Sequence, residues 1–323
     1  MCEIDRIDEN FKKLEAMKND IKNILVPVDF SDTSLNALKT AISIAKQQRA
    51  KIILLNVVDT TFMFGFKGVY YISEKTIDSL VDVSARMLSP LLGNLKEEHM
   101  LECTSEIKVG IVPQAIVNSA YKNKADLIIM GTHGASGVRE FFIGSTAQKV
   151  VKIASCPVLT IPPNKKWVDF KTILFPIRPV AGGVEKYDFL RKLIRHNYPS
   201  IKILILAPTY NDLEKETLQE LVKKLKTKLK DDGIKISGSL ISGTNMTEAV
   251  LKTSKSIGAD MIVITVTTDP AFKQFFIGPF EQHVVNHSTV PVLSIRPKLA
   301  SQDSQVVIQQ IHESFPGRLP SFA

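Results

Sequence analysis

One pattern of apolar segments occurs twice along this chain of 323 residues. KNILVPV at 22–28 is matched by KTILFPI at 171–177, and ADLIIM at 125–130 by ADMIVI at 259–264. Shorter matches join FFIG at 141–144 to the same letters at 275–278, and PVLTI at 157–161 to PVLSI at 291–295. Such a repeat means that one pattern of strands and helices is built twice, so the fold has to contain two related units.

Within the first copy, short apolar runs alternate with segments of helical periodicity. Short runs of β-branched and aliphatic residues are typical of buried strands, and apolar residues three and four apart are typical of helices. Pro90 lies inside one helical segment and predicts a kink or a break there. Strands that alternate with helices predict an α/β fold, a parallel sheet covered on both faces. We expect strands over 22–30, 51–58, 103–109, 125–130 and 156–162, and helices over 35–45, 74–99, 113–122 and 147–154.

Length and composition set the broad class. A chain of 323 residues with 44% hydrophobic composition can bury the cores of two domains. No apolar run reaches the roughly 20 residues that span a bilayer, and residues 1–23 lack the apolar stretch of a secretory signal. The cysteines at 2, 103 and 156 have no metal-ligand spacing. These observations favour a cytoplasmic protein with no membrane partner and no metal ligands of its own.

Part of the formal net charge of +8 is concentrated in one helical segment. Residues 213–230, LEKETLQELVKKLKTKLK, mix lysine with glutamate and leucine. This pattern is typical of a helix with one solvated face, so the charge does not by itself indicate a nucleic-acid partner. We expect no nucleic acid among the partners.

The repeat also predicts the domain boundaries. Before the first copy, Phe11, Leu14 and Met17 are spaced to contact something along one side of a helix. We expect an extension over 1–21, a nucleotide-binding domain over 22–163, a linker over 164–170, a degenerate second domain over 171–297 and a tail over 298–323.

A glycine-rich loop follows the fourth expected strand of the first copy. Residues 131–146 read GTHGASGVREFFIGST and lead into a helix. The first N–H groups of a helix have no internal partner, and the helix dipole favours an anion beside them. Ser145 and Thr146 add hydroxyl donors at this point. The loop therefore predicts a bound phosphate compound.

The spacing of the glycines in this loop resembles the nucleotide-binding motif of the universal stress protein family. The motif runs over 131–145 as G-x-x-G, nine further residues and G-S. P-V-D at 27–29 and V-V-D at 57–59, each after an expected strand, are similar to that family too. The resemblance covers 22–162 well, and 171–297 as a divergent second copy.

The resemblance implies an open five-stranded parallel sheet in each copy, in strand order 3-2-1-4-5, of the adenine-nucleotide α-hydrolase-like kind. ATP would lie across the carboxyl ends of the strands, where open α/β sheets bind their ligands. Mg²⁺ bridging the phosphates is expected with it. Carried over by position, the binding residues are Pro27, Val28 and Val57 at the adenine, Asp29 at the nucleoside, Met130 and Gly131 at the floor, and Gly134, Gly144, Ser145 and Thr146 at the phosphates.

Some of these positions have interpretations that need no ligand. Any single glycine can serve a tight turn, because a residue without Cβ adopts positive φ readily. Asp29 can instead cap the helix that begins near residues 32–34. His133 has no partner at a suitable spacing, and we expect no catalytic residue.

The second copy departs from the motif at most of the informative positions. Arg178 stands where Asp29 stands, and Pro279 replaces Ser145, which removes a backbone donor and a hydroxyl. Threonines occupy the positions of the first two glycines. We do not expect the same ATP pose in this copy, although Arg178 leaves a different anionic ligand open. The second domain is expected to be structural or regulatory.

Three functions remain open. The first is an ATP-binding stress-response regulatory protein, in which the nucleotide alters conformation or partner choice. The second is a slow Mg²⁺-dependent ATP hydrolase, and the third is a nucleotide-free interaction scaffold. The chain has no Walker-type GxxxxGK[ST] motif and no kinase-type HRD motif, which weighs against efficient catalysis. The complete first loop favours the ATP-binding protein.

The resemblance also implies that domains of this kind pair with each other, often through the fifth strand. The two copies can satisfy this within one chain, as an intrachain pseudo-dimer, and two chains can form a homodimer.

Overall fold

Ten strands and eight helices make up the two halves of the structure in the residues that it describes, apart from two strands of two residues each. The first half contains β1 (Asn23–Pro27), α2 (Asp32–Gln48), β2 (Lys51–Asp59), α3 (Glu74–Glu97), β5 (Cys103–Gly110), α4 (Val112–Lys122), β6 (Leu127–Gly131), α5 (Ser145–Ile153) and β7 (Val158–Ile161). The second half contains β8 (Thr172–Ile177), α6 (Lys186–Ile194), β9 (Ser200–Ala207), α7 (Asp212–Asp231), β10 (Ile236–Ser242), α8 (Met246–Ser256), β11 (Met261–Thr265), α9 (Pro279–His287) and β12 (Val292–Ile295). The computed structural model describes residues 21–60, 64–65, 68–69, 73–132, 144–163, 170–180, 183–195, 199–207, 212–243, 245–266 and 279–296.

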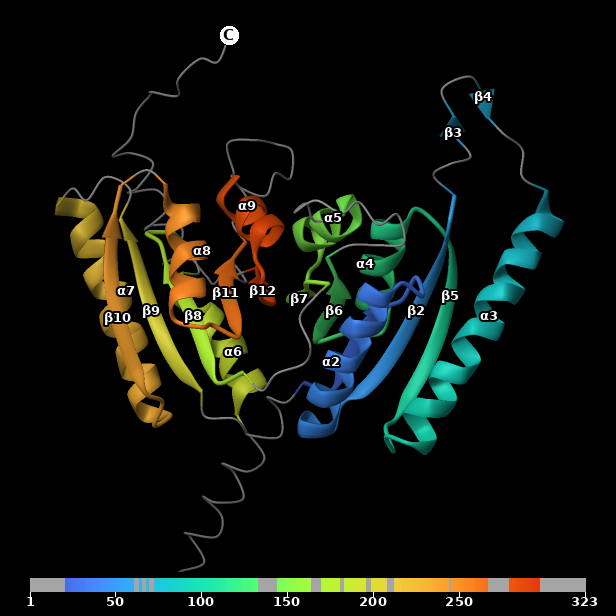
Figure 1. Ribbon diagram of the computed structural model, residues 1–323, viewed down its shortest axis with the longest axis horizontal. Helices are drawn as coiled ribbons and strands as arrows, with labels where there is room; N and C mark the ends of the chain where they lie inside the picture. The colour runs from blue at the N-terminus through green and yellow to red at the C-terminus, as the bar shows by residue number, and fades with distance from the viewer. Residues whose placement is uncertain are drawn as a thin grey trace, which may run out of the picture.

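The strands form one sheet in the order β10-β9-β8-β11-β12-β7-β6-β1-β2-β5 (Figure 1). Within each half all the neighbouring strands run parallel, and their order along the chain is 3-2-1-4-5. The α/β fold class expected from the sequence and the strand order that the family resemblance implies are therefore confirmed.

The two halves meet through their fifth strands, β7 and β12, which pair antiparallel. Side chains reinforce this join: the Thr160 hydroxyl donates to the Val292 carbonyl at 3.2 Å, and the Gln148 amide donates to the Asn286 side chain at 3.0 Å. The fifth strands of the two halves thus pair with each other inside one chain.

Helices cover both faces of the sheet, and each face has its own hydrophobic core (Figure 1). Leu88 of α3 and Leu225 of α7 belong to one core, which also takes in α2 and α6. Val150 of α5 and Val284 of α9 belong to the other, with α4 and α8. Strands buried on both faces have to be apolar along their whole length, which explains the continuous aliphatic runs in the sequence. Among the described residues, no helix has both the length and the apolar character that crossing a membrane requires.

The repeat extends to individual hydrogen bonds. Asp126, just before β6, accepts from the backbone N–H groups of Lys22 and Asn23 at 2.8 and 3.0 Å. Asp260, just before β11, accepts in the same way from residues 171–172 at 3.1 and 3.0 Å. In both halves one carboxylate therefore fixes the start of the first strand against the fourth.

One local expectation needs adjustment. Helix α3 runs without a break through Pro90, so the break offered as one alternative is wrong. After β2 the structure also has the short antiparallel strands β3 (Phe64–Gly65) and β4 (Gly68–Val69). The extension over 1–20 and the tail from 297 lie outside the described residues.

Candidate functional site

The carboxyl end of β1 is fixed to its neighbour β2 by main-chain and side-chain bonds. The Val28 N–H donates to the Leu55 carbonyl at 2.8 Å, and the Asn56 side-chain amide donates to the Val28 carbonyl at 2.7 Å. Asn56 is buried, so its amide provides a donor that the carbonyl would otherwise lack away from water. Pro27 is half-buried and Val28 is buried, which gives an apolar rim to this edge of the sheet.

Asp29 follows as an exposed residue and organises the start of α2. Its Oδ1 accepts from the N–H of Ser31 at 3.1 Å and from the Ser31 hydroxyl at 2.6 Å. Ser31 is the N-cap of α2, and its hydroxyl accepts from the Ser34 N–H at 3.3 Å. Between them Phe30 has a φ of 64°, an unusual conformation for a bulky residue. Ser31 is therefore the cap in place of Asp29, and Asp29 supports the helix start only through its bonds to Ser31. A ligand role of Asp29 would be additional to this.

Gly131, at the end of β6, is required by the packing of α2. A Cβ at this position would lie 2.6 Å from Cγ2 of Thr33 and 3.1 Å from its carbonyl carbon and oxygen. Only a residue without a side chain lets the first turn of α2 approach the strand this closely. Met130, the preceding residue, is buried, and Gly131 is partly exposed at the edge.

The start of α5 is held at the end of β6 by a backbone bond from the Gly144 N–H to the Thr132 carbonyl at 2.6 Å. Gly144 is the N-cap of α5 and, lacking a side chain, leaves the first N–H groups of the helix uncapped. Ser145 is exposed and Thr146 is half-buried in this first turn. Uncapped N–H groups with hydroxyls beside them suit an anion.

Parallel pairing brings most of the predicted residues to one edge of the sheet. β1 lies between β2 and β6, so Asp29, Val57 and Gly131 follow or end adjacent strands at the same edge. Val57 is half-buried near the end of β2. Gly134 lies outside the described residues, as do His133 and the rest of 133–143.

The same edge of the second half contains an ion pair. The Arg178 guanidinium, directly after β8, contacts the carboxylate of Glu281 in the first turn of α9. Glu281 is completely buried, and the side chain of Arg178 is 19% exposed. The guanidinium also lies 4.1 Å from the ring centre of Phe280, a cation–π contact.

A second cation, Lys186, lies beneath this pair at the start of α6. Its ammonium donates to the Pro176 carbonyl and lies 4.4 Å from the ring centre of Phe175. Burial lowers the pKa of Lys186 from 10.5 to about 7, with a further lowering by Arg178. The carboxylates of Glu281 and Glu185 act in the opposite direction.

The positions that differ between the halves thus have a structural explanation in the second half. Thr265, at the position of Gly131, is buried, and Pro279 opens α9 where Ser145 opens α5. Charged side chains of the chain itself occupy the region in which the first half presents Asp29 and the first turn of α5.

Sequence reasoning missed four residues that shape these two edges. Thr33 and Asn56 fix the backbone of the first edge, and Lys186 and Glu281 fill the second. The only signal for Glu281 was its place two residues after Pro279, in a helix start that the repeat aligned with α5. Thr33 and Asn56 carry no distinguishing pattern.

Two five-stranded halves of one sheet, each in the order 3-2-1-4-5, define the class: a tandem α/β protein of the adenine-nucleotide α-hydrolase-like fold. The model of the universal stress protein family matches residues 20–162 and 198–296, which is more than half of the chain. The chain belongs to the universal stress protein family, as a two-domain tandem member.

Two curated relatives each align with less than half of this chain. Universal stress protein MJ0531 of Methanocaldococcus jannaschii is 36% identical over 149 residues, which is 46% of this chain and 86% of that protein. Universal stress protein YxiE of Bacillus subtilis is 32% identical over 145 residues, 43% of this chain and 97% of that protein.

Among solved structures, a universal stress protein from Archaeoglobus fulgidus matches both halves together. Its TM-score is 0.69 over 85% of this chain and 98% of its own, at 17% sequence identity. At that identity the match supports the fold and says nothing of the ligand.

Proposed function

We propose that this protein is a cytoplasmic, ATP-binding regulatory protein of the stress response, with one nucleotide per chain, held by the first half. The observation that carries the proposal is the uncapped first turn of α5, anchored by Gly144 to the end of β6. Open α/β sheets bind their ligands at the carboxyl ends of the strands, and phosphates favour helix N-termini there.

The neighbouring strands support a nucleotide over a simple phosphate. Val28 and Val57 give β1 and β2 apolar ends suited to the adenine, with Pro27 at the rim. Asp29 supplies a carboxylate acceptor for hydroxyls of the nucleoside. Met130 and Gly131 form the floor, and Gly134, Gly144, Ser145 and Thr146 bind the phosphates, as the family resemblance implies.

Mg²⁺ fits this site as a companion of the nucleotide. In the described part of the chain, no three His, Cys, Asp or Glu side chains come together in a way that could hold a metal ion. Mg²⁺ commonly keeps several waters and binds through substrate phosphates. The phosphates of ATP would therefore supply most of its ligands other than water.

The second half has a structural or regulatory role in this proposal. At its carboxyl edge Arg178 is paired with the buried Glu281, and burial lowers the pKa of the neighbouring Lys186 to about 7. Removing a buried charge from such a cluster is costly, so the cluster opposes entry of a second ATP.

The test is to denature the purified protein and to identify released nucleotides by mass spectrometry. We expect about one ATP per chain, because the proposal places a single site at the helix N-terminus of the first half. Two ATP per chain would contradict the role of the second half. No nucleotide, with no ATP binding on titration, would favour a nucleotide-free scaffold.

A variant at Gly144 tests the phosphate assignment. Gly144 has a φ of −58°, which any residue adopts, so Gly144→Val is compatible with the backbone. Its side chain would stand at the first turn of α5, and we expect ATP affinity to fall at least about tenfold. Gly93→Val is the matched control, because a Cβ at Gly93 meets nothing within 4 Å. Equal ATP affinity in both variants would contradict the assignment.

The identity of the nucleotide is tested by comparing two ligands. One universal stress protein has been solved in complex with cAMP. Titration of the nucleotide-free protein with ATP and with cAMP separates the two ligands, and we expect ATP to bind more tightly because the helix N-terminus rewards a triphosphate.

A further inference from the structure

The outer edges of the two halves are covered differently. In the first half, α3 packs against the edge strand β5 and its neighbour β2. In the second half, α7 packs against β9 and β8, one strand further in. The edge strand β10 therefore has less cover on this face, and Leu240 in it is 46% exposed.

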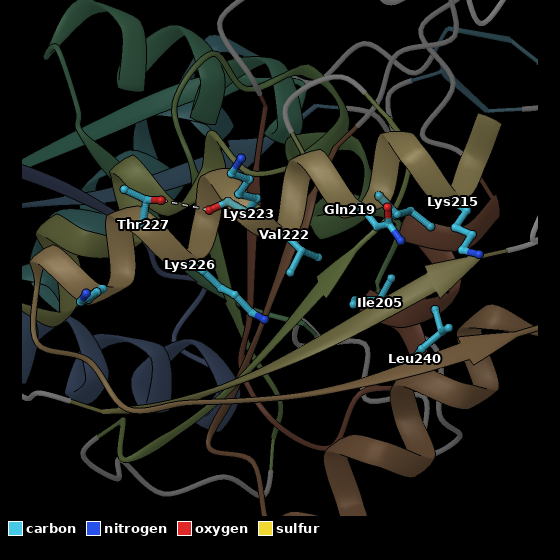
Figure 2. Close-up of a pocket in the computed structure, with 10 residues that line it drawn as sticks. Ile205, Lys215, Gln219, Val222, Lys223, Lys226, Thr227 and Leu240 are labelled. Atoms are coloured by element: carbon cyan, nitrogen blue, oxygen red, sulfur yellow. Dashed lines mark hydrogen bonds between the residues drawn. The ribbon is translucent and has the colours of Figure 1, made fainter. Parts of the chain in front are cut away.

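A groove of about 540 Å³ runs between α7 and the strands β9 and β10 (Figure 2). Its floor is apolar, with Ile205 of β9 and Leu240 of β10 directly opposite each other and Val222 of α7 above them. A second hollow shares these residues and extends the floor along the strands to Ile203 and Ile236. In this floor Leu240 is exposed and Ile205 and Ile236 are half-buried, whereas Ile203 is buried. Apolar side chains left open together in this way are typical of a surface that another segment covers.

The wall of the groove on α7 is basic. Lys215, Lys223, Lys226 and Lys230 line it, and no acidic side chain does among the side chains that the structure describes. Lys226 points from α7 towards the strands, and Lys215 lies at one end of the groove (Figure 2). Among the described residues, none of these four ammonium groups forms an ion pair. The surface therefore suits a segment with an apolar stripe and acidic flanks.

One segment of this chain has that character. Residues 1–20, which lie outside the described residues, contain six acidic and four basic side chains, whereas the whole chain has a net charge of +8. Ile4, Ile7, Phe11 and Leu14 recur at spacings of three and four, the period of an amphipathic helix. The tail from 297 is less suited, because its two acidic and two basic residues balance and two prolines follow residue 315.

The distances favour a segment from another chain. Ile21 is buried beside β1, and six strand steps separate β1 from β9 in the sheet. At about 4.8 Å a step this is roughly 29 Å, and 20 residues of helix measure about 30 Å. A helix that starts at Ile21 would use its whole length to reach the groove and could not lie along it.

We propose that the groove between α7 and β10 binds residues 1–20 of a second copy of this chain as an amphipathic helix. Two such segments and two grooves pair reciprocally in a two-fold dimer. The apolar stripe covers Ile205 and Leu240, and the acidic flanks face the lysines of α7.

The binding is tested with a labelled synthetic peptide of residues 1–20 and a chain that lacks residues 2–20. We expect saturable binding that weakens with salt and falls at least about tenfold in Lys215→Glu/Lys226→Glu. The control is Lys224→Glu/Lys255→Glu, the same charge change at exposed positions outside the groove. No binding, or equal loss in both variants, overturns the proposal.

Sedimentation equilibrium of the full chain tests the dimer. We expect a dimer that becomes a monomer on removal of residues 2–20 and in Leu240→Ser. Val109→Ser is the control, since Val109 is 45% exposed on the opposite edge strand β5. A full chain that stays monomeric, or a dimer that survives both changes, overturns the proposal. ATP binding is measured alongside and is expected to be the same in the truncated chain.

Discussion

Arg178 and Glu281 form an ion pair at the carboxyl edge of the second half. At the corresponding place in the first half lies the start of α5, which has no side-chain cap. Glu281 has no exposed surface, and the Arg178 guanidinium is additionally stacked on Phe280. The two halves share one strand order but differ in electrostatics at this edge. The first half presents uncapped N–H donors at the start of α5, whereas the second half pairs its arginine with its own glutamate.

Breaking this pair from one side should be costly. Glu281→Leu leaves Arg178 without its carboxylate, and we expect the free energy of unfolding to fall by about 3 kcal/mol, at the low end for buried pairs because Arg178 keeps some solvent contact. The double variant Arg178→Met/Glu281→Leu removes both charges and should lie within about 1 kcal/mol of the parent. Urea denaturation of the three proteins measures both values. A double variant as unstable as the single one would show that packing, and not charge, dominates.

Lys186 should make stability depend on pH. Its pKa is about 7 in the folded protein and ordinarily 10.5, so between these values the unfolded chain holds a proton that the folded chain has released. Stability therefore rises with pH across this window, by about 1.4 kcal/mol per pH unit for this group alone, and this contribution is lost as pH falls towards 7. The measurement is the difference in unfolding free energy between the parent and Lys186→Met at pH 7, 8 and 9. A difference that does not change with pH would mean that Lys186 keeps an ordinary pKa.

The contact between Gly131 and Thr33 predicts a pair of coupled substitutions. Gly131→Ala places a methyl 2.6 Å from Thr33 Cγ2, and we expect a loss of about 2 kcal/mol from overpacking. Thr33→Ser removes that methyl group and should recover part of the loss in the double variant, although the Thr33 backbone at 3.1 Å remains close. Chemical denaturation of the double-mutant cycle measures the coupling. Additive effects would contradict this account of the glycine.

The sequence predicted the fold in detail because parallel strands buried on both faces leave continuous aliphatic runs. The matches between 22–28 and 171–177, and between 125–130 and 259–264, located the first and fourth strands of both halves. The pairing of β7 with β12 agrees with the fifth-strand pairing that the family resemblance implies.

Contacts between distant residues could not be predicted in the same way. Gly131 was expected to serve a ligand, but its approach to Thr33 depends on how α2 crosses β6. Glu281 looks like an exposed residue of a helix start until Arg178 is brought beside it. Residues 213–230 were predicted as a helix with a solvated face, and the groove beside them arises only from the shift of α7 away from β10.

Asp29 has two roles to separate, and Ser31 provides the comparison. Both residues stabilise the start of α2, since Asp29 Oδ1 accepts from Ser31 and Ser31 caps the helix. Ser31→Ala and Asp29→Ala should each lower the free energy of unfolding by about 1 kcal/mol through the loss of this cap. Only Asp29→Ala also removes the proposed acceptor for the nucleoside, so its ATP affinity should fall at least about tenfold, while Ser31→Ala should bind ATP within about twofold of the parent. Isothermal titration with ATP on both variants, with thermal melts as the stability reference, measures the two effects separately. If the variants lose stability and affinity in parallel, Asp29 acts on the nucleotide only through the helix that it supports.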